Sequence, residues 1–504
     1  MNASRQSRLI EGLASTLKAE GKEVTIRETH ISWVLLAGED AWKIKKEVDF
    51  GFLDFSTLEK RKFACEEELR LNRRFAPAIY LGVVSIGGPV DRPRIDAQST
   101  PLEFAVHMRR FDDSGLLSTL ASKQLLEPRH IDAVAFRVAQ MHQQIQAAEH
   151  GSHWGEPQQV HSWLLESFDH IRALVDAAEL EQVRRCEQLA NGLYAALQGN
   201  FTARNDSGFV RECHGDLHLR NMVWEGEKVI PFDCIEFNPG LRWIDVMSEA
   251  AFVMMDLQER GYSQLAWRFI NHYLAHTGDY EGLRILRYYA CYRALVRAKV
   301  MLLQRAEEET PDTNRPELYA QYRAYAGLAE QWLRSRRPLL MITHGLSASG
   351  KSTAARRLAE RYACIHIRSD TERKRLHGLE VLADSRSGTD SGIYVSSASD
   401  KTYQRLFELA ASILDAGYPL IVDATFLQRK RRLHFQQLAA DLNCPFLIIH
   451  CHAHEKELER RIVARARKQN DPSEATLEVL HAQIRQQQPL GEDETALRVE
   501  DSAA

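Results

Sequence analysis

The chain has 504 residues, of which 44% are hydrophobic and 27% are charged, and its formal net charge is -4. This composition is typical of a folded globular protein, argues against a disordered or fibrous chain, and at this length predicts roughly two to four domains. The small net charge gives no overall drive toward nucleic acid or an anionic membrane, and the sequence has no run of about 18 apolar residues, as a membrane span would need.

The cysteines and the first residues indicate the compartment. The eight cysteines are scattered along the chain without a C-x-x-C pair, which favours reduced thiols. Residues 1–22 lack the apolar core of a signal peptide. The sequence therefore predicts a cytoplasmic protein without a membrane segment.

Short strands and one long helix are expected in the first part of the chain, about residues 20–110. From about residue 112 to 335 the pattern is mostly helical, with a strand-like apolar run at 229–237. These features predict an α+β domain of two lobes over residues 1–335. In its small lobe we expect helices over residues 8–19 and 57–75, and strands over residues 31–36, 41–45, 79–86 and 102–111.

The pattern changes after a short linker at residues 334–338. Buried-type strands in "LLMITHG", "PLIVDAT" and "PFLIIHC" alternate with helical segments, which is typical of a doubly wound parallel sheet covered on both faces. We therefore predict an α/β domain over residues 338–504. Within it, the Ser-rich stretch 383–401 is typical of a mobile loop, and the acidic end at 491–504 is typical of a solvated tail.

The motif "GLSASGKST", residues 345–353, matches G-x-x-x-x-G-K-[ST] between a predicted strand and a predicted helix. Its glycines let backbone N–H groups surround a phosphate chain, and the helix start adds a positive dipole end. Lys351 is expected to reach the β- and γ-phosphates of ATP, and the Ser352 hydroxyl to bind Mg²⁺. The predicted nucleotide contacts are Gly345, Ser347, Ala348, Ser349, Gly350, Lys351, Ser352 and Thr353.

Two aspartates follow predicted strands of the same domain. Asp423 ends the strand "LIVD" and could hold Mg²⁺ through water; a strand-end cap is the alternative. Asp370 follows the second strand of the domain and could accept a proton from a substrate hydroxyl, or it could cap the helix that follows.

Arg461 and Arg465 are four residues apart and could share a helix face toward the γ-phosphate. A solvated charged face is the alternative. Residues 338–490 resemble the small P-loop kinases, such as gluconate-kinase-like and polynucleotide-kinase-like proteins. The resemblance implies that Asp370 acts as the base and that Arg461 and Arg465 clamp the nucleotide.

A second motif, "HGDLHLRN" at residues 214–221, fits H-x-D-L-x-x-x-N, the catalytic loop of kinases. In that loop the aspartate, here Asp216, orients and deprotonates the attacking hydroxyl, and the asparagine, here Asn221, reaches Mg²⁺. Asp233 follows on the next predicted strand, where a metal-binding aspartate is expected. The letters D-F-G at 49–51 precede the catalytic loop, so we expect them to shape a turn instead.

The strand "AWKIK" places Lys43 and Lys45 on one face, because side chains alternate along a strand. Lys43 is predicted to neutralise the α- and β-phosphates and to pair with a glutamate of the following helix. That helix is expected to bury Phe63, Leu71 and Phe75. Glu67 is therefore the preferred partner, and Glu66 and Glu68 remain alternatives.

With "HGDLHLRN", the Asp233 that follows and the helical surroundings, residues 20–335 resemble the aminoglycoside phosphotransferase family. That family has the kinase fold and phosphorylates small molecules. The resemblance implies that Asp216 is the base and that Asn221 and Asp233 bind magnesium. The order of the two halves resembles bacterial proteins described as bifunctional aminoglycoside phosphotransferase and ATP-binding proteins. The short distance from Asp233 to Asp245 leaves no room for a long activation loop.

Together these motifs predict an ATP- and Mg²⁺-dependent phosphotransferase with two nucleotide sites and a small-molecule hydroxyl as acceptor. Three possibilities remain open. Both halves could be kinases, one half could be catalytic while the other senses nucleotide, or the P-loop half could act on a nucleic-acid end.

Overall fold

The computed structural model describes residues 5–500, apart from residues 52, 97, 307–310, 312, 336, 384–395, 469–472 and 474. The chain forms two compact units, each made of several segments. The boundary predicted between residues 335 and 338 follows the change in sequence pattern and stays a prediction. Unit 1 comprises Met1–Ala133, Gln144–Val160 and Thr202–Asp256, and unit 2 comprises Val134–Gln143, His161–Phe201 and Leu257–Ala504.

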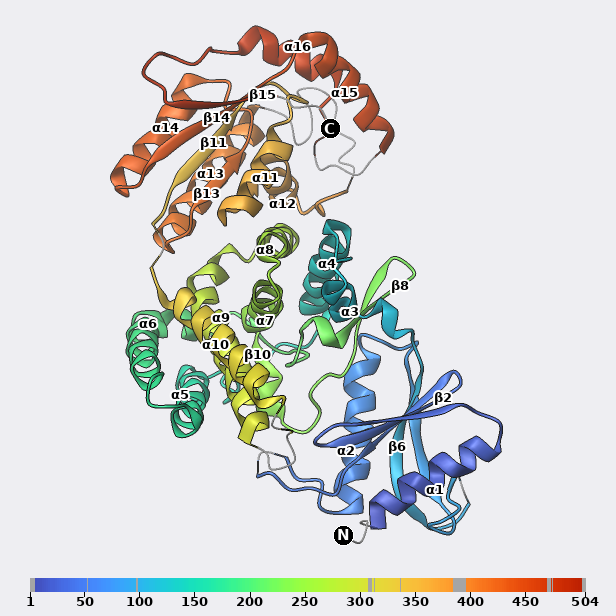
Figure 1. The fold of residues 1–504 in the computed structure, drawn as a ribbon. Coiled ribbons are helices and arrows are strands. Elements are labelled where there is room, and N and C mark those ends of the chain that lie inside the picture. Colours follow the sequence, from blue (N-terminus) through green and yellow to red (C-terminus); the bar gives the residue numbers. More distant parts are fainter. Residues whose placement is uncertain are drawn as a thin grey trace. The chain divides into compact units, whose positions relative to one another are not determined.

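Unit 1 contains a six-stranded antiparallel sheet in the order β1-β2-β3-β6-β4-β5. Helix α1 (Arg5–Ala19) packs its apolar side on one face, and helix α2 (Leu58–Arg73) covers the other face (Figure 1). The elements predicted for the small lobe are confirmed. The strands are β1 (Val24–Glu28), β2 (Ser32–Ala37), β3 (Asp40–Lys45), β4 (Tyr80–Gly87), β5 (Arg94–Ile95) and β6 (Pro101–Arg109).

Strand β3 shows how the sheet separates two kinds of side chain. Trp42 and Ile44 lie in the apolar cluster under α1. Lys43 and Lys45 alternate with them and point to the α2 face, where both bind Glu68. The predicted common face of the two lysines is confirmed.

The remainder of unit 1 carries "HGDLHLRN" between short strands. Strand β7 (Val210–Glu212) leads into the motif and pairs with β10 (Trp243–Asp245), while β8 (Met222–Glu225) and β9 (Lys228–Pro231) form a hairpin behind it. Strand β9 ends at Pro231, so the apolar run 229–237 is strand only at its start. The other elements are η1 (Asp113–Gly115), α3 (Leu117–Ser122), η2 (Leu219–Asn221) and η3 (Pro239–Leu241). Helices α4 (Pro128–Gln144) and α7 (Val246–Glu259) each belong partly to unit 1 and partly to unit 2.

Unit 2 contains a set of long helices, as predicted for the stretch before residue 335. Apolar and aromatic side chains fill the space between them, for example Trp267 against Trp332 and Phe201 against Tyr288. The helices are α5 (Pro157–Leu174), α6 (Leu180–Asp206), α8 (Ser263–Thr277), η4 (Tyr280–Gly282), α9 (Leu283–Ala306) and α10 (Arg315–Leu333).

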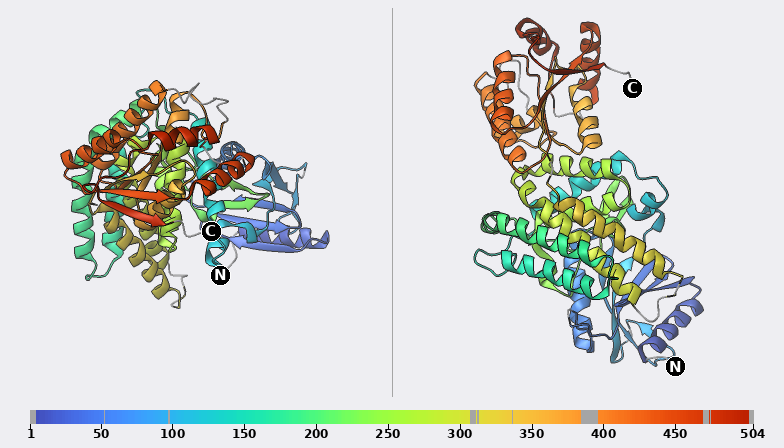
Figure 2. Two further views of the ribbon diagram at one scale, coloured as in Figure 1. Left: turned by 90° about the horizontal axis from the view of Figure 1, so that it is seen from above. Right: turned by 60° about the vertical axis from the view of Figure 1, so that its left-hand side comes forward.

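The last part of unit 2 has a five-stranded parallel sheet in the order β12-β13-β11-β14-β15, with helices on both faces (Figures 1 and 2). The predicted doubly wound α/β fold is confirmed. Its elements are β11 (Leu340–His344), α11 (Lys351–Tyr362), β12 (Ile365–Arg368), α12 (Ser369–Leu376), α13 (Ser396–Asp415), β13 (Leu420–Asp423), α14 (Arg429–Asp441), β14 (Phe446–His452), α15 (Glu455–Lys468), α16 (Leu477–Gln486) and β15 (Ala496–Glu500).

The acidic end of the chain is not a solvated tail over its described length. Strand β15 adds to the sheet beside β14. Just before it, Glu494 is buried and binds Arg432, which is 1% exposed, at 2.6 Å. The prediction of a tail is wrong here because β15 pairs with β14 and because Glu494 has a buried partner, Arg432, that lies far away in the sequence.

Helix α8 is tied directly to the P-loop part of unit 2. Asn271 donates to the carbonyl oxygen of Cys364 at 3.0 Å and accepts from the N–H of His366 at 2.8 Å. Arg268 of the same helix binds Glu360 at 2.8 Å. Residues 384–395 of the predicted mobile loop lie outside the described residues.

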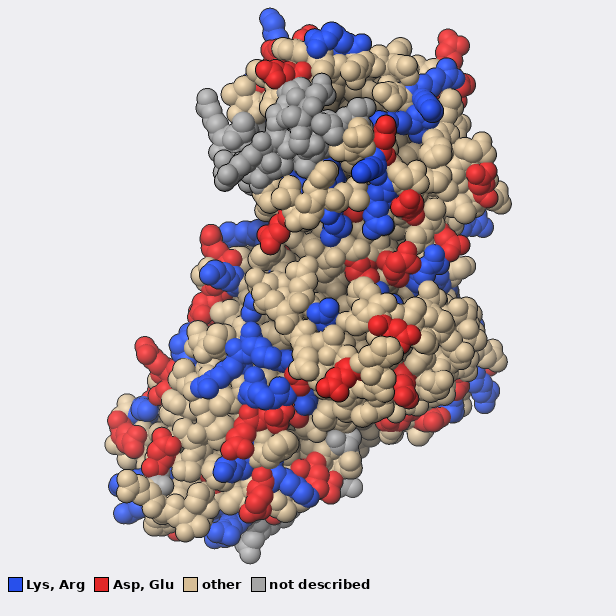
Figure 3. Space-filling model, turned by 180° about the vertical axis from the view of Figure 1, so that it is seen from behind, with Lys and Arg blue, Asp and Glu red and all other residues tan. Residues whose placement is uncertain are grey.

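Basic and acidic side chains are interspersed over the face of the molecule in Figure 3, in keeping with the small net charge. Among the helices in the described part of the chain, none is both long enough and apolar enough to cross a membrane.

Candidate active sites

Lys43 lies in a buried cluster of charged side chains in unit 1. Its Nζ donates to Glu68 Oε1 at 2.9 Å and forms an ion pair with Asp233. Burial by itself lowers the pKa of Lys43, but the charges of Asp233 and Glu68 outweigh burial and raise the pKa well above its usual value. The ammonium group therefore stays charged, as phosphate binding requires.

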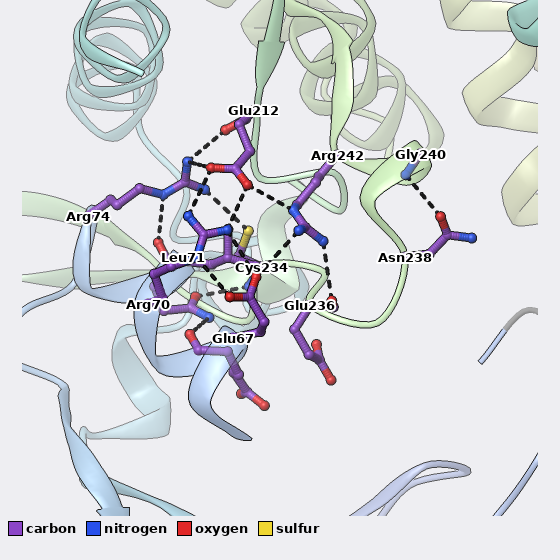
Figure 4. Close-up of polar contacts among 12 residues, drawn as sticks. Glu67, Arg70, Leu71, Arg74, Glu212, Cys234, Glu236, Asn238, Gly240 and Arg242 are labelled. Atoms are coloured by element: carbon purple, nitrogen blue, oxygen red, sulfur yellow. Dashed lines mark hydrogen bonds and ion pairs between the residues drawn. The ribbon is translucent and has the colours of Figure 1, made fainter. Parts of the chain in front are cut away.

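The glutamate that meets Lys43 is Glu68, so the preference for Glu67 is wrong. Phe63 was expected on the buried face of α2 but is 64% exposed, which places that face one position away from the predicted one. Glu67 instead binds Arg70 at 2.9 Å and Arg242 at 3.4 Å (Figure 4). The buried residues of α2 recur every three or four positions: Arg61, Ala64, Cys65, Glu68, Leu71 and Asn72.

Asp216 and Asn221 lie next to each other in the loop after β7. Asn221 Nδ2 donates to Asp216 Oδ2 at 3.0 Å, and His218 Nε2 lies 3.3 Å from the same oxygen. The other ring nitrogen of His218 accepts from the N–H of Arg220 at 3.2 Å, so the ring proton lies on Nε2 and is donated to Asp216. These two donors fix the orientation of the Asp216 carboxylate.

The first two residues of the motif, His214 and Gly215, are held by a hydrogen bond and by a close backbone approach. His214 is buried, donates from Nε2 to the carbonyl oxygen of Phe232 at 2.8 Å, and has its pKa lowered by burial. Gly215 has a φ of +88°, and a Cβ there would lie 2.8 Å from the carbonyl oxygen of Leu241. This backbone has no space for the arginine that many protein kinases carry at this position.

Asp233 follows β9 by two residues and has a φ of 65°. Its N–H donates to the Tyr80 hydroxyl at 3.0 Å, and the neighbouring Phe232 N–H donates to the carbonyl oxygen of Asn221 at 3.0 Å. The structure thus brings both predicted metal ligands of unit 1 together. Burial alone would raise the pKa of Asp233, but Lys43 lowers it, and the side chain remains 44% exposed.

The letters D-F-G at residues 49–51 form a turn, as predicted. The N–H of Gly51 donates to Asp49 Oδ1 at 2.9 Å, and the N–H of Phe50 donates to the carbonyl oxygen of Leu53 at 2.9 Å. Phe50 is 49% exposed. This segment is distinct from the Asp233 segment that lies beside Lys43.

In unit 2, residues 345–350 form a tight loop between β11 and α11, and residues 351–353 begin α11. Gly345 has a φ of +146°, and a Cβ at this position would lie 2.2 Å from the carbonyl oxygen of Cys451. Lys351 Nζ donates to the carbonyl oxygen of Leu346, near the start of the loop, at 2.5 Å. The predicted strand, loop and helix context of the motif is confirmed, while its nucleotide contacts stay a prediction.

Ser352, in the first turn of α11, and Asp423, at the end of β13, are the two predicted metal ligands of this part and lie side by side. The Ser352 hydroxyl hydrogen-bonds to Asp423, and Thr343 Oγ1 lies 3.4 Å from Asp423 Oδ1. Burial alone would raise the pKa of Asp423, but the His366 hydrogen bond and the Arg368 charge hold it well below its usual range. Asp423 is therefore an ionised, buried carboxylate beside the loop.

Asp370 lies in the first turn of α12. The N-cap of this helix is Arg368, so Asp370 is not the cap that the alternative reading expected. Its Oδ1 accepts from Arg373 Nη1 at 2.9 Å. The proposed role of Asp370 as a base stays a prediction.

Helices α15 and α16 pack directly on the loop. Leu458, Ile462 and Leu480 form a cluster with Leu346 and Ala348 of the loop itself. Two polar contacts between described residues add to this packing. Arg461 Nη1 lies 3.4 Å from the carbonyl oxygen of Ala348, and Gln483 Oε1 accepts from the Ser347 N–H at 2.8 Å. The side chain of Arg465 lies outside the described residues.

A pair of histidines lies under the loop. His344, at the end of β11, is 1% exposed, and its Nδ1 lies 2.8 Å from His450 Nδ1 on β14. Burial, and then the neighbouring His450, lower the pKa of His344 to about 4. His344 is therefore a neutral part of the sheet core.

His218 and Gln483 are among the residues at these sites that were not predicted. His218 is part of the motif around Asp216, and its spacing of two residues from that aspartate is a usable signal. Gln483 lies 136 residues from Ser347, and its neighbourhood carries no motif, so the sequence offered no signal for it.

Comparisons with known proteins find one family model and one group of relatives for this chain. The AAA domain family matches residues 340–490. The uncharacterized protein Rv2004c of Mycobacterium tuberculosis is 31% identical over 464 residues, which cover 91% of this chain and 89% of that protein. The chain belongs to the same family as this mycobacterial protein.

Two solved structures are similar to different parts of this chain. An ethanolamine kinase of Plasmodium vivax is 9% identical, covers 61% of this chain and 82% of its own, and has a TM-score of 0.39. A gluconokinase from Sinorhizobium meliloti 1021 is 19% identical, covers 34% of this chain and 86% of its own, and has a TM-score of 0.25. The predicted P-loop part is confirmed, because its motif lies within the match to the AAA domain family.

Proposed function

We propose that the chain binds ATP and Mg²⁺ at two sites, one in unit 1 and one at the P-loop of unit 2. At each site the γ-phosphoryl group would pass to a hydroxyl group of a small molecule. The observation that carries the proposal is the convergence in unit 1 of Lys43, Asp216 and Asp233, whose charges interact. That set of groups is what kinase-type transfer requires.

In unit 1, Lys43 would bind the α- and β-phosphates, held in place by Glu68. Asn221 and Asp233 would hold Mg²⁺, which supplies positive charge to the phosphate oxygens when it is bound. Asp216 would accept the proton of the acceptor hydroxyl while that oxygen forms a bond to the γ-phosphorus and the bond to ADP breaks. Most of the rate enhancement would come from positioning and charge stabilisation.

In unit 2, the backbone N–H groups of residues 345–353 and the start of α11 would surround the phosphates. Lys351 would bind the β- and γ-phosphates, and Ser352 with Asp423 would hold Mg²⁺. Asp370 is the candidate base. Arg461 of α15 is the candidate residue for clamping the nucleotide, because its side chain reaches the carbonyl oxygen of Ala348 in the loop.

A small molecule is the preferred acceptor for unit 1. Only eleven residues separate Asp233 from Asp245, and part of this segment is taken up by η3 and β10. A long activation segment, on which protein kinases dock peptides and accept regulatory phosphates, does not fit in that length. The resemblance to the aminoglycoside phosphotransferase family supports the same class of acceptor.

The test is acceptor-dependent release of ADP by the full chain, with a panel of hydroxylated metabolites and aminoglycosides. Asp216→Ala should abolish one activity, by about 10²–10⁴-fold, and Lys351→Ala should abolish a second, separable one. Lys46→Ala is the matched control, because the Lys46 side chain pairs with the exposed Glu28 and lies over the ring of Trp33.

If Asp216→Ala has no effect on any turnover while Lys351→Ala removes all of it, unit 1 is a binding or sensing module and the proposal fails for that site. Salt-sensitive phosphorylation of oligonucleotide ends would instead identify a nucleic-acid acceptor for the P-loop part.

A further inference from the structure

Lys45 is a second buried lysine beside the predicted phosphate-binding lysine. Its side chain is 0% exposed and forms ion pairs with Glu68 and Glu236, both also buried. The ring of Phe55 lies 5.6 Å from its Nζ. A lysine that solvent cannot reach and that two carboxylates hold cannot itself contact phosphate, so its effect on the site must act through these partners.

Glu68 is shared between the two lysines. Its Oε1 accepts from Lys43 Nζ at 2.9 Å, and its Oε2 accepts from Lys45. Each oxygen of the carboxylate is thus held from one side. Because a bidentate carboxylate can rotate only if both bonds break, Lys45 fixes the orientation in which Glu68 presents its other oxygen to Lys43.

Glu236 lies three residues after Asp233, on the same loop. Its carboxylate binds Lys45, and its carbonyl oxygen accepts from Arg242 Nη1 at 3.2 Å (Figure 4). Between the two acidic residues, the N–H of Cys234 donates to Asn72 Oδ1 of α2 at 2.9 Å. The loop is therefore held against β3 and α2 at three successive points.

The same loop is tied to α2 by a second group of charges, shown in Figure 4. Glu212, just before the catalytic loop, accepts from Arg70 of α2 at 2.7 Å and from Arg74, the C-cap residue of α2, at 2.9 Å. Arg242, from the far end of the loop, joins them at 3.2 Å from Glu212. Glu212 thus ties the start of the catalytic loop to α2, and Arg242 ties the end of the Asp233 segment to Glu212 and to Glu67 of α2.

The charges of the inner cluster do not balance. Two ammonium groups face three carboxylates, those of Glu68, Asp233 and Glu236. In keeping with this excess, burial raises the pKa of Glu236 despite the opposing charge of Lys45. Removing the charge of Glu236 therefore leaves a balanced cluster, whereas removing Lys45 leaves one cation against three anions.

We propose that Lys45 and Glu236 are positioning residues of the kinase-like site, which couple the glutamate of α2 to the loop that carries Asp233. Lys45 acts on Lys43 through Glu68, and Glu236 acts on the metal-binding carboxylate through the loop between them. Both residues are always present in the chain, so the assembly of the site does not depend on an external signal. This inference rests on the proposed function of Lys43 and Asp233.

The experiment uses the full chain with Lys351→Ala, so that only the site of unit 1 binds nucleotide. Binding of a fluorescent, non-hydrolysable ATP analogue is titrated with Mg²⁺ in Glu236→Gln, and thermal unfolding is recorded in parallel. We expect the Mg²⁺ concentration for half-maximal binding to rise about tenfold, as for other residues that support a metal ligand. The midpoint of unfolding should stay at or above that of the parent, because the variant balances the charge.

Glu28→Gln is the matched control, because Glu28 pairs with the next lysine, Lys46, but is 63% exposed; it should leave both quantities unchanged. Lys45→Met should show the same shift in Mg²⁺ dependence where it folds. An unchanged Mg²⁺ dependence in Glu236→Gln would overturn the inference. Asp233→Asn separates the two levels: if it also leaves binding unchanged, the proposed function of unit 1 fails, and if it weakens binding while Glu236→Gln does not, only the positioning role fails.

Discussion

The two candidate sites are built in opposite ways. In unit 1, the charged groups come from distant positions, Lys43, Glu68, Asp216 and Asp233, and they meet only when the sheet, α2 and the catalytic loop pack together. In the P-loop part, the consecutive residues 345–353 form most of the site. A dispersed site depends on the packing of its elements, and a contiguous site depends on the local conformation of one loop.

The largest effect that separates the two designs should come from Gly345→Ala. The added Cβ would lie 2.2 Å from the carbonyl oxygen of Cys451, and neither backbone can move without opening the loop. We expect loss of nucleotide binding at the P-loop and a destabilisation of about 1–3 kcal/mol, while binding in unit 1 persists. Titration of an ATP analogue and denaturant unfolding measure the two effects.

Gly327→Ala is the control for that change. Gly327 lies in α10, and a Cβ there would meet nothing within 4 Å, so this variant should be neutral or slightly stabilising. Normal nucleotide binding by Gly345→Ala would contradict the account of the loop as a tight backbone site.

A smaller effect distinguishes two neighbouring glutamates of α2. Glu68→Gln breaks contacts with both buried lysines, so we expect nucleotide affinity in unit 1 to fall by about tenfold or more. Glu67→Gln removes contacts with Arg70 and Arg242 and should change affinity by less than about threefold. The measurement is the same ATP-analogue titration, with Lys351→Ala in both variants. A larger effect of Glu67→Gln would reverse the assignment made from the packing of α2.

The smallest effect concerns His344 under the P-loop. Its pKa in the folded chain is about 4, below the ordinary value of about 6.5 in an unfolded chain. Between these values the unfolded chain binds a proton that the folded chain does not, so stability falls as the pH falls. When the pH is lowered from 7 to 5, the free energy of unfolding of His344→Asn should therefore fall by about 1–2 kcal/mol less than that of the parent.

Denaturant unfolding of the full chain at the two pH values measures this difference. His454→Asn is the control, because its side chain is exposed. An equal loss of stability in the parent and in His344→Asn would show that His344 does not titrate as its burial implies.

The strand, loop and helix around residues 345–353 were predictable, because the motif carries its own backbone conformation. The strands around Lys43 and Lys45 were predictable as well, since alternation alone places both lysines on one face. The choice between Glu67 and Glu68 was not, because it depends on the rotation of α2. There, exposed Phe63 and buried Arg61, which binds Glu103 at 2.9 Å, reverse the usual preference of apolar and charged residues.

The remaining contacts could not be predicted, because they are ion pairs between residues far apart in the sequence. The charges near the end of the chain resemble a solvated tail in sequence, yet Glu494 is satisfied by Arg432, 62 residues earlier. Glu236 gave no signal either, because its partner Lys45 lies 191 residues away. Such pairs become visible only when the fold has brought the two segments together.

The two hydrogen bonds that Asn271 makes to the backbone at the start of β12 affect how such a chain can evolve. One amide holds the carbonyl oxygen of Cys364 and the N–H of His366, so the P-loop part shares a compact unit with the helices that precede it. A recombination breakpoint near residue 338 would strip these partners from the sheet and leave its backbone groups exposed. We therefore expect gene fission in this family to be rare at the point where the sequence motifs change, and a stable exchangeable module to carry α8 with it.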